Sequence, residues 1–182
     1  SQLQKHEKKF KLTALKKEAR LRDYEDAIFW LTDAMIMNPC YNTTEPSIGL
    51  KLNMNRITMK CYMADTGLLI SHAVNNGMIV ENIVAQMLTA AGHKLYFYSN
   101  PSTDDADARM EIDFLISKSK ITSRHNISPI EVKSGKNYAL TSIKKCMKKY
   151  HEQLHVPYVL HTGDVKTEDS IVYLPLYMTG CL

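Results

Sequence analysis

The sequence predicts an α/β fold with a mixed central sheet flanked by helices, preceded by a smaller, mainly helical module. The first reason is the order that hydrophobic patterning indicates for residues 61–182: helix, three strands, helix, two strands. This order is typical of a sheet with helices on its faces. The second reason is composition, since 182 residues with 45% hydrophobic and 23% charged side chains can bury one good core or two small ones.

The first 60 residues predict two helices and a hairpin. Apolar residues recur at a helical interval from Leu12 to Ala19, and Asp23 is placed to cap a second helix over residues 24–35. The hairpin is expected between residues 35 and 52, where four turn-forming residues separate short apolar runs. These residues are Pro39, Asn42, Pro46 and Gly49. The outline is that of a winged-helix-like module over residues 1–60, and DNA binding, protein docking and support of the next domain all stay open as its role.

A polar stretch at residues 55–60 marks a soft boundary, and residues 61–182 form the second predicted domain. A helix is predicted from about Met78 to Ala91, with Gly92 as its C-terminal stop. The later elements are strands at 94–99, 111–116 and 129–133, a helix at 140–154, and strands at 156–161 and 171–177.

Two of these strands carry acidic and basic residues at the spacing of a metal-dependent phosphodiesterase centre. Glu131 and Lys133 are two residues apart, so in a strand their side chains leave the same face of the sheet. If the two strands are antiparallel neighbours with Asp113 opposite Glu131, their connection has its midpoint at Thr122. Thr122 lies in a polar stretch where a turn is expected. The spacing therefore allows Asp113 and Glu131 to be cross-strand neighbours.

Adjacent carboxylates can hold Mg²⁺ or Mn²⁺, which offsets the charge of a phosphodiester and produces hydroxide from water at neutral pH. Lys133 is expected to orient the attacking water or to stabilise the developing charge. Glu111 is either an accessory ligand or a solvated glutamate at a strand edge. The alternative for Asp113, Glu131 and Lys133 is a same-face network of ion pairs.

The motif D-x(17)-E-x-K after a helix resembles the PD-(D/E)xK nuclease superfamily, which has the restriction-endonuclease-like fold. That resemblance implies a further acidic ligand from the first helix, and Glu81 fits that place. The metal ligands it implies are Asp113, Glu131 and Glu81, with Lys133 as the fourth catalytic residue. The position before Asp113, a proline in the superfamily name, is Ile112 here.

A narrower resemblance covers nearly the whole chain. Its segments are KKFKL, DAMIMNPC, MADTGLL, VENIVAQML, EIDFLI and PIEVKSGK. They are similar to a C-terminal domain of unknown function in bacterial AAA-type ATP-binding proteins. The resemblance implies an ATPase domain upstream in the same protein, and a chain that begins with Ser1 agrees with this expectation.

Positive charge gathers around the candidate site although the net charge is only +4. The predicted nucleic-acid-binding residues are Lys136, Lys144, Lys145, Lys148 and Lys149. The alternative for these lysines is a solvated helix face. Two functions follow as hypotheses. One is a nuclease-like domain acting on nucleic acid, and the other is a catalytically inactive module of the same fold that binds DNA or a partner protein and regulates the ATPase.

Several functional classes are disfavoured by the sequence. The glycine pattern of a phosphate-binding loop is missing, so we expect that this chain does not itself bind ATP. No apolar stretch is long enough to span a bilayer, and we expect a cytoplasmic protein without membrane contact. The four cysteines have no zinc-site spacing. A homo-oligomeric assembly is left open.

Overall fold

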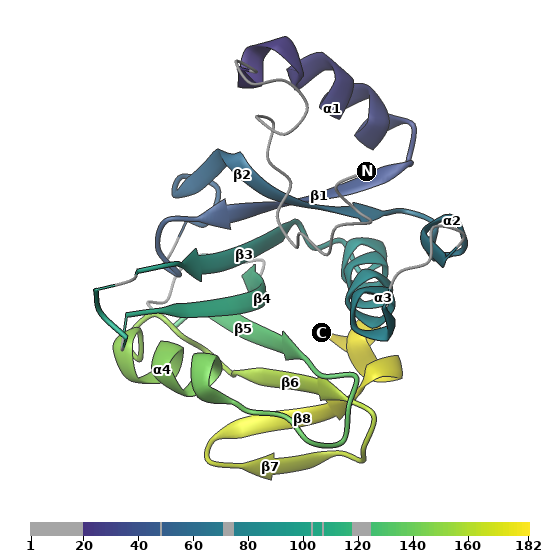
Figure 1. The fold of residues 1–182 in the computed structure, drawn as a ribbon. Helices are drawn as coiled ribbons and strands as arrows, with labels where there is room; N and C mark the ends of the chain where they lie inside the picture. Colours follow the sequence, from purple (N-terminus) through teal and green to yellow (C-terminus); the bar gives the residue numbers. More distant parts are fainter. Residues whose placement is uncertain (1–19, 48, 71–74, 103, 107, 118–124) are drawn as a thin grey trace.

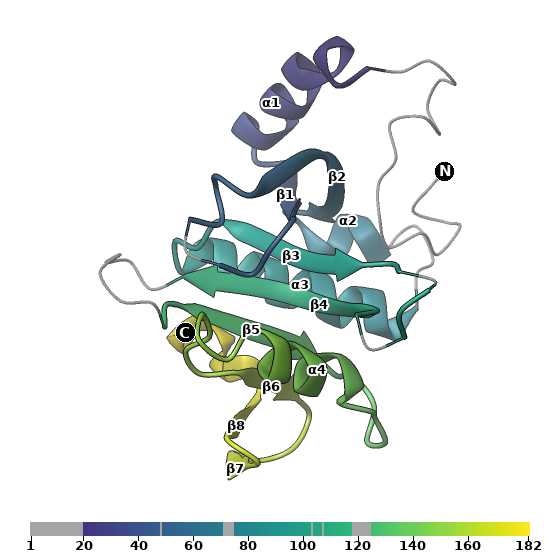
Figure 2. The same cartoon turned by 90° about the vertical axis from the view of Figure 1, so that its left-hand side faces the viewer.

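A computed structural model describes residues 20–47, 49–70, 75–102, 104–106, 108–117 and 125–182, which form one mixed sheet with helices on both of its faces (Figures 1 and 2). The described residues hold eight strands in the order β2-β1-β3-β4-β5-β6-β8-β7. The predicted α/β class, with a mixed central sheet flanked by helices, is confirmed.

The strands differ widely in length, and the longest lie in the first half of the sheet. Their bounds are β1 Met37–Thr43, β2 Met54–Met63, β3 Leu95–Asn100, β4 Met110–Ser117, β5 Ile127–Val132, β6 Tyr158–His161, β7 Lys166–Glu168 and β8 Ile171–Pro175. Pairing is antiparallel for β1 with β2, β3 with β4, β4 with β5 and β7 with β8, and parallel at the other three junctions.

The helical elements divide between the two faces and one edge of the sheet. Their bounds are η3 Leu21–Asp23, α1 Glu25–Asp33, α2 Thr66–Ile70, α3 Asn76–Ala90, α4 Thr141–Lys149 and η4 Leu176–Cys181. In Figure 2, α3 lies behind the strands and α4 lies in front of them. The helix α1 lies beyond the β2 edge, and none of its residues is buried (Figure 1).

Two apolar cores fill the two faces of the sheet. The core under α3 includes Val84 and Leu88 from the helix, packed with Phe97 and Phe114 from the strands. Val84, Ala85 and Leu88 supply this apolar face of α3, whereas Ile83 is exposed. The helix α3 therefore covers one side of the sheet from β2 to β5, and η4 extends this cover over β6 and β8.

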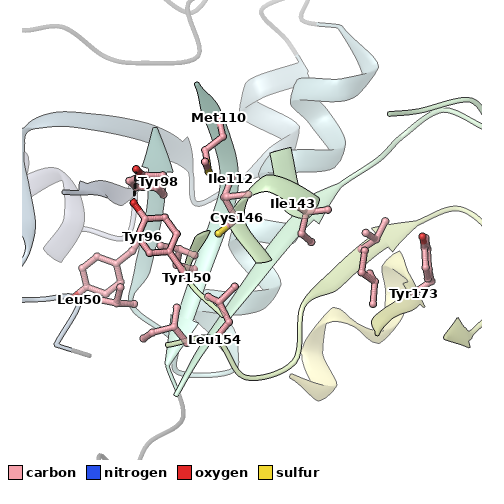
Figure 3. Close-up of a cluster of buried hydrophobic side chains, with 14 residues drawn as sticks. Leu50, Tyr96, Tyr98, Met110, Ile112, Ile143, Cys146, Tyr150, Leu154 and Tyr173 are labelled. Atoms are coloured by element: carbon pink, nitrogen blue, oxygen red, sulfur yellow. Dashed lines mark hydrogen bonds between the residues drawn. The ribbon is translucent and has the colours of Figure 1, made fainter. Parts of the chain in front are cut away.

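The second core lies under α4 and is drawn in Figure 3. Ile143 and Cys146 from the helix pack toward Ile112 on β4. The hydroxyls of Tyr98 and Tyr150 hydrogen-bond each other at 2.9 Å, so neither polar tip is buried without a partner (Figure 3). This packing fixes α4 against the central strands.

The register between β4 and β5 agrees with the sequence-based prediction. Phe114 pairs with Ile130, which gives the same midpoint at residue 122. Continuing that register by one residue places Asp113 opposite Glu131. The predicted turn around Thr122 falls on residues 118–124, which lie outside the described residues.

Most predicted elements are confirmed, with different ends. The helix at 78–91 is α3, and Gly92 follows it with φ +90°, the left-handed conformation that ends helices. The helix predicted at 140–154 is shorter and ends at Lys149. The short elements α2 and β7 were not predicted, since both are stretches of five residues or fewer.

The N-terminal region differs more from its prediction. The helix predicted between Leu12 and Ala19 lies outside the described residues, and the second predicted helix is α1. A hairpin is present, but its second strand is β2 rather than a strand ending before residue 52. The predicted polar boundary at 55–60 is therefore part of a strand, and β1 continues the central sheet through β3. The winged-helix interpretation stays a prediction.

No helix in the part of the chain that the structure describes is long and apolar enough to cross a membrane.

Candidate functional site

A polar cavity of about 510 Å³ lies between α3 and the strands β4 and β5. Its lining includes Asp113 from β4, Glu131 from the end of β5 and Glu81 from α3. Lys133, which directly follows β5, lines it as well. The structure thus brings together all four residues that the sequence predicts as a site.

The register of β4 and β5, continued by one residue beyond the pair of Phe114 and Ile130, explains why Asp113 and Glu131 meet. The side chain of Asp113 also crosses to the neighbouring strand, because its Oδ2 accepts a hydrogen bond of 2.9 Å from the backbone N–H of Val132. This charge-assisted bond fixes the carboxylate beside β5 at the point where the strand ends. Ile130 is fully buried in the core under α3, whereas the next residue, Glu131, lines the cavity.

Lys133 and Glu131 form a close ion pair, with 2.6 Å between Nζ and Oε2. Glu131 is only 4% exposed, and burial raises the pKa of its carboxyl to about 7. Negative Asp113 adds to that rise, while Lys133 works against it. Burial acts to lower the pKa of Lys133, but the charge and hydrogen bond of Glu131 outweigh it and raise that pKa. The ammonium therefore stays charged beside a carboxyl that changes charge near neutral pH.

A second lysine, which is not among the residues predicted from the sequence, contacts the other carboxylates of the site. Lys60 on β2 is 2% exposed, and its Nζ lies 2.9 Å from Glu81 Oε1, 3.3 Å from Glu111 Oε1 and 3.8 Å from Asp113 Oδ1. Its ammonium also lies 5.1 Å from the centre of the Phe97 ring. Burial acts to lower the pKa of Lys60, yet the three carboxylates outweigh it and raise that pKa. Lys60 is a buried, permanently charged group.

Tyr62, two residues further along β2, contacts the same carboxylate as Lys60. Its hydroxyl donates a hydrogen bond of 2.6 Å to Glu81 Oε1. Burial, followed by the charge of Glu81, raises the pKa of Tyr62 well above its ordinary value, so the hydroxyl remains a donor. The sequence signal for this part of the site is a single lysine within the apolar run Met59–Met63, because such a charge needs a carboxylate partner when it is buried.

Glu111 and the start of α3 complete the cavity wall. Glu111 is not a solvated glutamate at a strand edge, which is one of the two roles expected for it. It lines the cavity and pairs with Lys60. Asn75 caps α3 by accepting a hydrogen bond of 2.9 Å from the N–H of Met78. A Cβ added at Gly77 would lie 3.8 Å from Ser134 Oγ, an ordinary van der Waals distance, which places the start of α3 beside the loop after β5.

The residues present fit a divalent cation at Asp113 and Glu131. Carboxylate oxygens are the ligands that Mg²⁺ and Mn²⁺ prefer. Glu131 Oε1 is buried and accepts no hydrogen bond from the described part of the chain, an arrangement that a bound cation would relieve. Among the residues described, no three histidine, cysteine, aspartate or glutamate side chains are already arranged as a ligand set. Glu81 differs from Glu131 in that Lys60 and Tyr62 both donate to its Oε1.

The predicted nucleic-acid-binding lysines lie beside this cavity. A second hollow of about 880 Å³ is lined by Lys144, Lys145, Lys148 and Lys149 from α4, and Tyr138 lines both hollows. Lys144 pairs with Asp169 at 2.8 Å, and Lys145 donates to the backbone oxygen of Ala106 at 2.5 Å. Lys136 is exposed in the loop after β5 and lines neither hollow. The structure therefore gathers four of the five lysines.

A family model described as a domain of unknown function (DUF4143) matches residues 76–178, more than half of the chain. The chain belongs to the DUF4143 family. The matched range holds Glu81, Asp113, Glu131 and Lys133, whereas Lys60 lies in residues 1–78, which match a second domain of unknown function (DUF8612). No curated protein and no solved structure matches the chain.

The raised pKa of Glu131 in this DUF4143 domain predicts how stability changes with pH. Because the folded protein holds the carboxyl proton more tightly than the unfolded chain, Glu131 contributes stability below its ordinary pKa of 4.5 that is lost as the pH rises through about 7. Glu131→Gln, which mimics the protonated form, should match the wild type near pH 5 in metal-free buffer. At pH 8 it should exceed the wild type by on the order of 2 kcal/mol in free energy of unfolding.

Urea denaturation at the two pH values measures this difference. Glu168→Gln is the matched control, because Glu168 forms an exposed pair with Lys166 and its loss should change the free energy of unfolding by less than about 1 kcal/mol. A difference between Glu131→Gln and the wild type that stays constant or shrinks toward pH 8 contradicts the buried position of Glu131.

Proposed function

We propose that this chain carries a metal-dependent nuclease domain of the PD-(D/E)xK type, which hydrolyses phosphodiester bonds of nucleic acid. The observation that carries the proposal is the convergence of Asp113, Glu131, Lys133 and Glu81 on one cavity. These residues come from three separate elements, so their meeting is a property of the fold and not of neighbouring sequence positions. The sheet with α3 on one face and α4 on the other supports a restriction-endonuclease-like arrangement.

Three of these side chains and the start of α3 have chemical roles in this proposal. Asp113 and Glu131 would hold a divalent cation, which would offset phosphate charge and lower the pKa of a water. Lys133 would orient the attacking water and stabilise the negative charge that develops on the phosphate. Gly77 and Met78 place the positive end of the α3 dipole in the same cavity, which favours an anionic group there.

The basic hollow on α4 supports nucleic acid as the substrate class. Four lysines line it, and it adjoins the carboxylate cavity at Tyr138. A phosphate backbone held by these lysines would have a neighbouring phosphate near Asp113 and Glu131. The Tyr138 ring between the two hollows offers an aromatic surface on which a base can stack.

The wider context follows from the resemblance to the C-terminal domains of AAA-type ATP-binding proteins. We place an ATPase domain upstream of this chain in the same protein, with ATP bound there and not by residues 1–182. Within residues 1–60, β1 and the first part of β2 belong to the central sheet, so we propose that this region supports the nuclease domain.

Cleavage assays on a panel of labelled substrates test the proposed function. The panel holds single-stranded DNA, duplex DNA, branched DNA and single-stranded RNA. We expect cleavage of at least one substrate in Mg²⁺ or Mn²⁺ and none in EDTA. Cleavage that persists in EDTA contradicts the metal role, and no cleavage of any substrate contradicts the catalytic function.

The alternative is a catalytically inactive module that binds DNA or a partner protein and regulates the ATPase. One observation favours it: Lys60 and Lys133 already pair with the carboxylates of the site. Under this alternative the four lysines of α4 still bind nucleic acid, and binding does not depend on Asp113. Salt-sensitive binding without cleavage is the result that distinguishes it from the nuclease.

A further inference from the structure

We propose that Lys60 is a built-in counter-cation of the carboxylate site. Its positive charge offsets the carboxylates, so the domain folds without metal, and it repels a divalent cation that binds to the same carboxylates. The inference deepens the proposed function and rests on its metal site. It concerns a residue outside the range that matches the DUF4143 model, and it assigns that residue a role in how tightly the site holds metal.

The position of Lys60 carries the first step. Three carboxylates, those of Glu81, Glu111 and Asp113, lie within 4 Å of its ammonium, and all three line the cavity. Lys60 is not among the cavity-lining residues, and only 2% of it is exposed. The ammonium therefore contacts the three carboxylates from the buried side of the site, while their other side faces the cavity.

The charge balance carries the second step. Glu81, Glu111 and Asp113 supply three negative charges and Lys60 one positive charge, while Glu131 and Lys133 cancel each other. Among the described residues, these six side chains carry a formal charge of −2 when all are ionised, which one divalent cation would neutralise. Without Lys60 the cluster would carry −3, and its buried carboxylates would repel each other more strongly.

The surroundings of Lys60 show that its charge is held in a fixed place. Its Nζ lies over the Phe97 ring, and Tyr62 donates to the same oxygen of Glu81 that Lys60 contacts. A buried ammonium with a ring on one side and carboxylates on the other has little freedom to move away when a metal arrives. Its repulsion of a second cation therefore persists in the metal-bound protein and weakens binding.

Lys60→Met tests the inference, because methionine is unbranched, similar in length and uncharged. In Mn²⁺ titrations followed by electron paramagnetic resonance, which detects free Mn²⁺, the variant should bind at least about tenfold more tightly than the wild type. Its metal-free Tm should fall below that of the wild type, and saturating Mn²⁺ should raise its Tm by more than it raises that of the wild type. Lys166→Met, which removes an exposed paired lysine on β7, should leave both the affinity and the Tm response unchanged.

A second pair of variants covers the case in which Lys60→Met does not fold without metal. Glu81→Gln and the double variant Lys60→Met/Glu81→Gln differ by the same lysine in a background with one carboxylate fewer. The double variant should again bind Mn²⁺ more tightly than its single partner. Equal or weaker Mn²⁺ binding after loss of Lys60, in either background, overturns the inference.

The outcome is separable from that of the proposed function. Cleavage by the wild type with no gain of Mn²⁺ affinity in the variants lacking Lys60 overturns only the counter-cation role. A gain of affinity with no cleavage by the wild type supports the counter-cation role and overturns the nuclease.

Discussion

Asp113→Asn is expected to lower metal-dependent cleavage by at least about 10³-fold, because the substitution removes one of the two carboxylates that hold the cation. Asparagine keeps the size of the side chain and an oxygen that can accept the hydrogen bond from the Val132 N–H, so the β4–β5 register should be retained. The measurement is the single-turnover rate on the best substrate of the panel in saturating Mg²⁺. The Tm of the variant is measured beside it to show that the protein is folded.

Glu168→Gln is the matched control for this experiment. It also neutralises one carboxylate, but on the exposed strand β7, where Glu168 pairs with Lys166. We expect its cleavage rate to equal that of the wild type. A folded Asp113→Asn variant that cleaves at the wild-type rate would exclude the cavity as the centre of catalysis.

Removal of three lysines from α4 is expected to weaken nucleic-acid binding by at least about 100-fold at low salt, with cleavage reduced through lost binding. The triple variant is Lys144→Gln, Lys148→Gln and Lys149→Gln. Lys145 is kept because it donates to the backbone oxygen of Ala106 and so fixes the neighbouring loop. The slope of log affinity against log salt concentration should decrease in magnitude by about 2 to 3, since each lost phosphate contact contributes 0.7 to 0.9.

Fluorescence anisotropy with a labelled oligonucleotide at several salt concentrations measures both quantities. Lys166→Gln removes an exposed lysine from another element and should change neither of them. Binding by the triple variant with wild-type affinity and slope would show that the hollow on α4 is a solvated helix face. The same experiment applies to the inactive-module alternative, because it needs no cleavage.

The helix α3 and the strands β4 and β5 can be predicted from local sequence patterns. The helix α3 has its apolar residues at helical spacing and Gly92 directly after it, with the positive φ that this position needs. A polar connection of the right length predicts that Asp113 lies opposite Glu131, because antiparallel register is set by the midpoint of a hairpin. The observed pairing of Phe114 with Ile130 has the same midpoint. Short strand-like runs between polar stretches indicate the strands β4 and β5 themselves.

The role of Lys60 and the position of β2 cannot be predicted from local patterns, because both depend on tertiary contacts. Lys60 makes the stretch 55–60 look like a polar linker, yet the residue is buried because carboxylates from α3 and β4 surround its ammonium. Those partners lie more than 20 positions away in the sequence, so no local pattern displays the pairing. The second strand of the N-terminal hairpin was misplaced for the same reason, since charge at a buried strand position contradicts the usual alternation.

A crystal structure of the wild-type protein soaked in Mn²⁺ tests the central claim most directly. The proposed metal site predicts one ion in the cavity between α3 and β5, with carboxylate oxygens of Asp113 and Glu131 both within about 2.0 to 2.6 Å of it. Glu131 Oε1, which accepts no hydrogen bond from the described residues, should be one of those ligands. Clear density for the cavity residues without an ion at saturating Mn²⁺, or an ion bound only away from Asp113 and Glu131, would contradict the claim.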